Sequence, residues 1–142
     1  MIRPYKEPDK PKLIELCREF WESSSLDLGP FDYDHTSQKL DHIISAGACI
    51  VSDNVDGFIL FVESTNLCNS RSICAEVAWY VTPSARGGLG IKLLDAAIRY
   101  CQIKGVSCLS MMFMQSSMPE SIEKIYGKLG FELRETTYVK RI

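Results

Sequence analysis

The stretch SARGGLGIKLLDAA, residues 84–97, places one basic residue and three glycines in five positions, directly before a helix-spaced apolar segment. These four residues are Arg86, Gly87, Gly88 and Gly90. Glycine weakens a helix, so three of them at its start need a reason. The first amides of a helix lack internal partners and lie at the positive end of its dipole. The stretch therefore predicts either a tight turn for close helix–sheet packing or an anion site of backbone amides assisted by Arg86.

Two common phosphate-binding motifs do not fit this stretch. No Lys-Ser or Lys-Thr pair follows the glycines, which excludes the GxxxxGK[ST] loop. The glycine spacing is not GxGxxG, and the elements predicted before it are antiparallel hairpins instead of a βαβ unit.

The size and charge of the chain narrow the function classes. Its 142 residues suit a single domain spanning 1–142. The net charge of −2 and the pI of about 5.7 argue against general electrostatic binding to nucleic acid or to an anionic membrane. No apolar run reaches membrane-spanning length.

The six cysteines are predicted to be reduced thiols that bind no metal. The N-terminal segment MIRPYKEPDKPK is charged and lacks the apolar region of a secretory signal. No CxxC pair is present, and most cysteines lie far from both histidines. We therefore expect a cytoplasmic protein.

Apolar periodicity and turn residues predict the element order β-α-α-β-β-β-α-β-α-β. Strands are expected at 1–5, 48–53, 57–64, 73–82, 106–114 and 131–142. Asp9 with Pro11 marks the start of the first helix, and Asp34 caps the second, which Gly47 ends. Gly105 ends the third helix. Ser117 and Glu120 mark the start of the last helix, with Pro119 in its first turn, and Gly130 ends it. This mixture predicts an α+β sheet with helices on its faces.

Two segments of the chain resemble the GNAT superfamily of N-acetyltransferases. VAWYVTPSARGGLGIKLLDAAI (residues 77–98) resembles the family's motif A, and PESIEKIYGKLGFELRETTY (residues 119–138) resembles its closing segment. The element order also matches, so the resemblance covers essentially the whole chain. It implies the GNAT fold, a central mixed and mostly antiparallel sheet of about six strands flanked by about four helices. The sequences of these two segments most resemble those of compact phage- or prophage-type members.

The resemblance implies acetyl-CoA as cosubstrate and transfer of its acetyl group to a primary amine. The pantetheine is expected to pair with the backbone at Trp79 to Val81. The pyrophosphate is expected on a loop of six residues: Arg86, Gly87, Gly88, Leu89, Gly90 and Ile91. Counted from Arg86, the family's glycines fall at Leu89 and Ile91, so the loop is expected to be one residue shorter than usual. Pro119 is a second departure, because many members carry Asn there.

Acetyl transfer to an amine needs a neutral amine, a polarised thioester carbonyl and a protonated leaving thiolate. The resemblance implies that Glu76 accepts the proton that the amine loses and that Tyr126 donates a proton to the departing thiolate. Strand alternation places Glu76, Ala78 and Tyr80 on one face, and the alternative for Glu76 is a solvent-facing strand edge. The alternative for Tyr126 is a core residue on the helix face of Ile122 and Leu129.

The acceptor is expected near PFDYDHTS, residues 30–37. Asp32, Tyr33 and His35, together with Tyr80, are its candidate binding residues. A solvated loop with Asp34 as a helix cap explains the segment equally well. The acceptor is a small-molecule or a protein amine, and a homodimer is left open. The alternative function is a non-catalytic acyl-CoA-binding or protein-interaction module on the same fold.

Overall fold

A computed structural model describes residues 1–24, 27–114 and 118–142 of the chain. The chain divides into two compact units, Met1–Met112 and Phe113–Ile142. The first unit contains a sheet and three α-helices, and the second contains one helix. A single domain over 1–142 stays a prediction.

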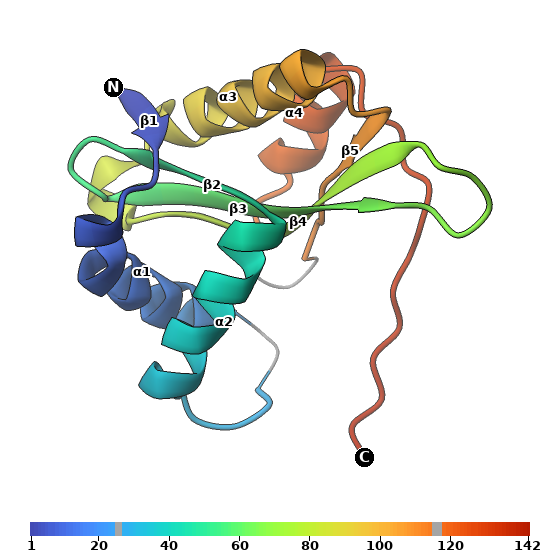
Figure 1. The fold of residues 1–142 in the computed structure, drawn as a ribbon. Helices are drawn as coiled ribbons and strands as arrows, with labels where there is room; N and C mark the ends of the chain where they lie inside the picture. The colour runs from blue at the N-terminus through green and yellow to red at the C-terminus, as the bar shows by residue number, and fades with distance from the viewer. Residues whose placement is uncertain (25–26, 115–117) are drawn as a thin grey trace. The chain divides into compact units, whose positions relative to one another are not determined.

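The first unit is built on one five-stranded sheet whose strands follow chain order from edge to edge (Figure 1). Strands β1 to β4 are antiparallel, and β5 runs parallel to β4. The strands are β1 (Ile2–Pro4), β2 (Gly47–Ser52), β3 (Gly57–Thr65), β4 (Ser72–Val81) and β5 (Cys108–Ser110). The predicted α+β class is confirmed, with five strands instead of about six.

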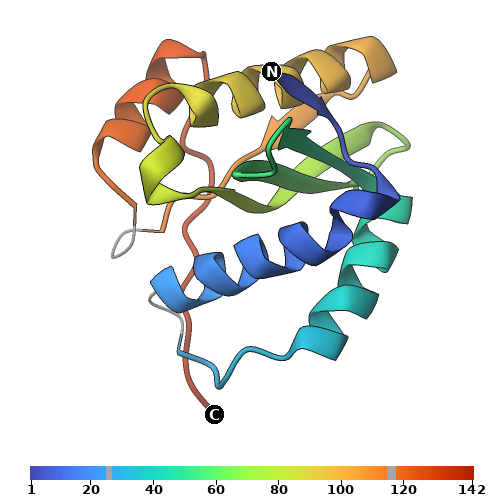
Figure 2. The same cartoon turned by 90° about the vertical axis from the view of Figure 1, so that its left-hand side faces the viewer.

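The helices of the first unit cover both faces of the sheet. Helices α1 (Lys10–Ser23) and α2 (Tyr33–Ala46) lie on one face, and α3 (Leu89–Lys104) lies on the other (Figures 1 and 2). The core under α1 and α2 consists of Leu13, Ile14, Leu16, Leu40, Cys49, Val51, Val55, Phe58, Leu60 and Ala78. On the other face, α3 contributes Leu93, Leu94 and Ala97, all fully buried. None of the helices among the described residues is both long and apolar enough to span a membrane.

Two helix ends follow the sequence signals and one does not. Gly47 ends α2, and Gly105, with φ of 70°, ends α3 as predicted. The cap of α2 is Asp32 and not Asp34, because the carboxylate of Asp32 accepts a hydrogen bond from the amide of His35 at 2.9 Å. Asp34 lies in the first turn of the helix. Either aspartate suits a cap, and the helix begins at Tyr33, which makes Asp32 the residue in position to cap it.

A β-bulge in β4 overturns the expected alternation of its side chains. Phe61 of β3 pairs with Glu76, and Leu60 pairs with Ala78, which leaves Val77 as an extra residue. Ala78 and Tyr80 pack with the core under α1 and α2. Phe61, opposite Glu76, meets Tyr100 of α3 edge-on with ring centroids 5.1 Å apart. Glu76 therefore lies on the α3 face, opposite to Ala78 and Tyr80.

The C-terminal elements are shorter than expected. The strand predicted at 106–114 is limited to Cys108–Ser110. Helix α4 (Ser121–Lys128) follows Glu120 as its N-cap, so Pro119 precedes the helix, and the predicted capping residue Ser117 lies outside the described residues. Residues 131–142 form no strand, and Leu133 and Tyr138 are 89% and 93% exposed. Their alternating pattern suits a strand, but a strand requires backbone pairing, and this segment forms no ladder with the described residues.

Candidate functional site

Two of the three glycines at the start of α3 are required by the conformation of the turn. Gly87 and Gly88 have φ of 126° and 113°, a region that residues with side chains rarely adopt. A side chain at either position would meet nothing within 4 Å, so the requirement is the turn itself. At Gly90, an added Cβ would lie 3.4 Å from the indole ring of Trp79, an ordinary contact distance, so the packing of α3 on β4 does not require glycine there. The tight turn that the sequence suggested is present, and it accounts for Gly87 and Gly88.

The turn leaves the first amides of α3 free of partners in the helix. Gly88 is the N-cap, and its carbonyl accepts the bond from the amide of Lys92 at 3.1 Å. The amides of Leu89, Gly90 and Ile91 precede that bond, at the positive end of the dipole. The first turn of α3 carries no acidic residue. This helix end can therefore bind an anion, and its residues are those of the predicted loop.

The edge of β4 next to this helix end is open. β5 pairs with β4 only between Ile73–Ala75 and Cys108–Ser110. Beyond Ala75, β4 forms no further ladder pair with β5 among the described residues. We call the place where the two strands part, beyond Ala75 and Ser110, the fork. The strand edge beyond Ala75 ends at Val81, where an extended ligand with amide groups could add alongside the strand.

Glu76 lies at the fork and is buried, with 7% of its surface exposed. Burial raises the pKa of its carboxyl group to about 8, although the backbone amide of Met112 hydrogen-bonds the carboxylate and acts in the opposite direction. Its Oε1 atom is buried and has no hydrogen-bond partner within the described part of the chain. A solvent-facing edge, the alternative interpretation of Glu76, is wrong. A carboxyl group with this pKa can exchange protons near neutral pH.

Arg86 lies against β4 in this structure. Its Nε atom donates a hydrogen bond to the carbonyl oxygen of Val81 at 3.2 Å. Its guanidinium carbon lies 5.9 Å from the centroid of the Tyr80 ring. The Tyr80 ring also meets Phe20 of α1 edge-on, with centroids 6.3 Å apart. Tyr80 and Arg86, predicted for acceptor and cofactor respectively, are thus in direct contact.

The other acceptor candidates lie at the start of α2. The carboxylate of Asp32 caps the helix through the amide of His35. The Tyr33 side chain is 43% exposed. Asp32 therefore has a structural role, and an acceptor-binding role for Asp32, Tyr33 and His35 stays a prediction.

Tyr126 belongs to α4 in the second unit. Its ring packs on Phe131 with centroids 5.3 Å apart, and its carbonyl accepts a hydrogen bond from the Phe131 amide at 2.9 Å. These contacts hold the turn after α4 together. The acid role of Tyr126 stays a prediction.

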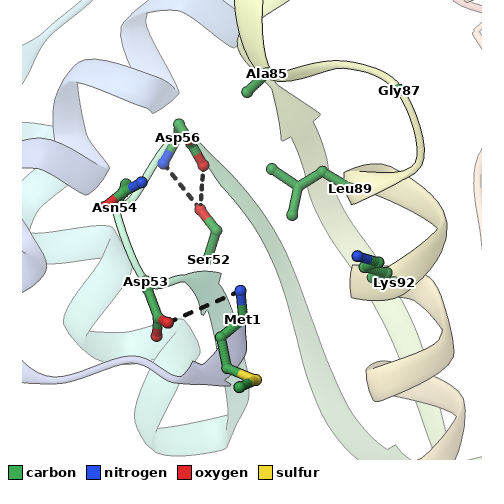
Figure 3. A pocket seen from close by; sticks show the side chains of 9 residues that line it. All are labelled: Met1, Ser52, Asp53, Asn54, Asp56, Ala85, Gly87, Leu89 and Lys92. Atoms are coloured by element: carbon green, nitrogen blue, oxygen red, sulfur yellow. Dashed lines mark hydrogen bonds and ion pairs between the residues drawn. The ribbon is translucent and has the colours of Figure 1, made fainter.

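A surface pocket of about 330 Å³ lies between the β2–β3 turn and the glycine turn (Figure 3). Asp56 and Ser52 are joined by a 2.5 Å hydrogen bond, and Asp53 faces the Met1 amino group at 3.8 Å. Leu89 and Lys92 of α3 form the opposite wall. The two carboxylates are balanced by the Met1 amino group and Lys92, so the pocket carries no excess of either charge.

The sequence analysis missed the structure of the β2–β3 turn. Val55 has φ of 53° and a buried side chain, a strained conformation for a β-branched residue. The hydroxyl of Ser52 accepts hydrogen bonds from the amides of Asp56 and Gly57, at 3.0 and 3.2 Å, which supports that conformation. The NVDG tetrapeptide predicted a turn, but nothing in it indicated Ser52 as its anchor.

The six cysteines are free thiols. Cys74 of β4 and Cys101 of α3 interact through a hydrogen bond, and burial raises the pKa of both. No cluster of three or more metal-ligating side chains occurs among residues 1–24, 27–114 and 118–142.

Comparison with known proteins gives likeness in structure but none in sequence. No family model and no curated protein matches the chain. A probable acetyltransferase of known structure superposes with a TM-score of 0.80 at 16% identity, covering 100% of this chain and 97% of its own. A ribosomal-protein-alanine N-acetyltransferase from Brucella melitensis biovar Abortus 2308 gives 0.76 at 18% identity, covering 100% and 99%.

An aminoglycoside N-acetyltransferase solved in complex with CoA gives a TM-score of 0.72 at 22% identity, covering 100% of this chain and 93% of its own. The likeness establishes the fold. The chain has the GNAT acetyltransferase fold that its two motifs predicted, and the resemblance to phage-type members stays a prediction.

Proposed function

We propose that the protein is an acetyl-CoA-dependent N-acetyltransferase that acetylates a primary amine. The observation that carries the proposal is the adjacency of an open strand edge and a free helix end. The pairing of β5 with β4 stops at Ala75, and the chain leads from Val81 through residues 82–86 to the glycine turn and the first amides of α3. Such an arrangement suits a ligand that has an amide-bearing arm and a phosphate group.

The chain's groups fit the parts of coenzyme A. The backbone at Val81 would pair with the pantetheine arm beside the strand edge that β5 leaves. The amides of Leu89, Gly90 and Ile91 would bind the pyrophosphate at the start of α3. Gly87 and Gly88 shape the turn that lets the ligand approach these amides. Arg86 would add a charged hydrogen bond once it leaves the carbonyl of Val81.

The bound thioester would supply an activated acetyl carbonyl. The amine nitrogen forms a bond to that carbon, and the carbon–sulfur bond breaks. Glu76 would accept the proton that the amine loses, and Tyr126 would give its hydroxyl proton to the departing sulfur. Because Glu76 lies on the α3 face and Tyr80 on the other, an amine beside Tyr80 would reach Glu76 through water in the fork.

The proposal is tested with acetyl-CoA and a panel of primary amines. Acetyl-CoA at 100 times its dissociation constant should raise the stability of the fold by about 2.7 kcal/mol in a thermal-shift assay. Thiol release from acetyl-CoA should then depend on one class of amine. Stabilisation without thiol release for any amine would favour the acyl-CoA-binding module. The absence of both stabilisation and thiol release would refute both functions.

A further inference from the structure

A second surface pocket, of about 350 Å³, lies at the end of the sheet away from the glycine turn. Its floor consists of the last residues of β3, 63–65, and of Ser72 at the start of β4. The C-terminal end of α3 contributes Tyr100 and Lys104, and the junction of α2 with β2 forms another wall. Ser72 and Val81 are the two ends of the ten-residue strand β4, about 30 Å apart at about 3.3 Å per residue. The pocket is therefore remote from the proposed coenzyme A site.

This pocket, which we call the Glu63–Lys104 pocket, is lined by one charge of each sign. Glu63 is half-buried and Lys104 is exposed. Within the part of the chain that the structure describes, the two side chains form an ion pair neither with each other nor with a third residue. A carboxylate and an ammonium thus line one pocket without meeting, which leaves room for a ligand that contacts both.

Neighbouring rings place the two charges on the same side of the sheet. Glu63 follows Phe61 by two residues in regularly paired β3, so both side chains lie on the α3 face. The Phe61 ring meets Tyr100 edge-on with ring centroids 5.1 Å apart. The Nζ atom of Lys104 lies 5.8 Å from the centroid of the Tyr100 ring, whose face attracts a cation. Tyr100 therefore holds the ammonium group on the face of the sheet that carries the Glu63 carboxylate.

The rest of the lining is polar and closely built. Thr65 and Ser72 form a cross-strand pair beyond Glu63 and contribute hydroxyl groups. The Ser45 hydroxyl donates a hydrogen bond at 3.0 Å to a carbonyl one turn earlier in α2, and its oxygen can still accept one. At Gly47 an added Cβ would overlap the backbone of β3, so glycine is required where α2 passes into β2 beside the pocket. Such a lining suits a polar ligand.

We propose that the Glu63–Lys104 pocket binds a free amino acid, with its ammonium group at Glu63 and its carboxylate at Lys104. A free amino acid carries both charges on one carbon atom, so it can bridge two side chains of opposite sign that do not meet. The pocket volume lies at the lower end of the range for small-molecule sites, about 300–1,000 Å³, which suits a ligand of this size. The site goes beyond the proposed function, because its occupation requires neither coenzyme A nor an acceptor amine.

The test is an NMR titration of the protein with L-serine and with L-glutamine. Both amino acids should bind saturably and shift the amide signals of Thr65 and Ser72. Serinol lacks the carboxylate of L-serine, and L-glycerate has a hydroxyl group in place of its ammonium. Each analogue loses one ion pair and should bind about fivefold more weakly than L-serine.

Variants of the two charged residues assign the site. Glu63→Gln and Lys104→Gln should each weaken L-serine binding by about fivefold, with little change in melting temperature. Asp95→Asn and Arg99→Gln, which neutralise an exposed ion pair of α3 outside the pocket, are the matched controls and should bind L-serine like the wild type. The inference is overturned if the wild type binds neither amino acid, if serinol and L-glycerate bind as tightly as L-serine, or if the pocket variants bind L-serine as tightly as the controls do.

Discussion

Glu76 and Tyr80 lie on opposite faces of β4, although they are four residues apart in one strand. In a regular strand an even separation places two side chains on the same face. The extra residue Val77 shifts the alternation by one position. The strand therefore presents a buried acid toward α3 and an aromatic ring toward α1, with the fork and its open edge between them.

The burial of Glu76 should make the stability of the fold depend on pH. The pKa of its carboxyl group rises from 4.5 to about 8, so the folded protein keeps a proton that the unfolded chain releases in this interval. The free energy of unfolding should therefore fall as pH rises through this window, by up to about 1.4 kcal/mol per pH unit. Glu76→Gln keeps the acceptor for Met112 and should remove this part of the slope. Parallel slopes for the two proteins between pH 5 and pH 8, measured by chemical denaturation, would show that Glu76 titrates normally.

The same carboxyl group should govern the pH dependence of turnover. If Glu76 accepts the amine's proton, kcat/KM should rise with pH and level off near its pKa of about 8. Glu76→Gln should lower the plateau by about 10²–10⁴-fold and abolish the rising limb. A rising limb that is unchanged in Glu76→Gln would assign it to the acceptor amine itself.

Tyr126→Phe separates an acid role from a packing role. The variant keeps the ring contact with Phe131 and removes only the hydroxyl group. As an acid, Tyr126 should account for a loss of about 10²–10⁴-fold in turnover with little change in coenzyme A affinity. If the hydroxyl serves structure alone, the variant should keep its turnover and lose about 1 kcal/mol of stability. Turnover and melting temperature are measured on the same preparation.

The caps of α2 can be distinguished by a pair of variants. Asp32→Ala should cost about 1 kcal/mol of stability, because the amide of His35 loses its acceptor. Asp34→Ala, in the first turn, should lose only the interaction with the helix dipole, which is about 0.3–1 kcal/mol. A larger loss for Asp34→Ala in thermal denaturation would restore Asp34 as the cap.

The sequence predicted those features that depend on local chemistry. Gly105 ends α3 because glycine adopts a positive φ readily, and the glycines after Arg86 mark the turn for the same reason. The apolar period of α1 placed Leu13 and Leu16 in the core. The motif around this turn led to the fold that the solved structures share.

The missed features depend on neighbours that local sequence does not reveal. The bulge at Val77 arises from the pairing of β3 with β4, and no glycine marks it. Arg86 rests on Val81 and Tyr80 because the fold brings them together, whereas its motif predicted a phosphate contact. The last segment has a strand's alternation but makes no pairing, so its pattern alone was insufficient.

Calorimetric titration of coenzyme A into the wild type, Gly88→Asn and Gly88→Asp tests the central claim most directly. Both substitutions place a side chain of the same size at a φ of 113°, so they share the backbone strain and differ only in charge. We predict that the wild type binds one coenzyme A and that Gly88→Asp binds at least about tenfold more weakly than Gly88→Asn, because a carboxylate at the helix end repels the pyrophosphate. Equal affinities of the two variants, or no binding by the wild type, would contradict the glycine turn as the coenzyme A site.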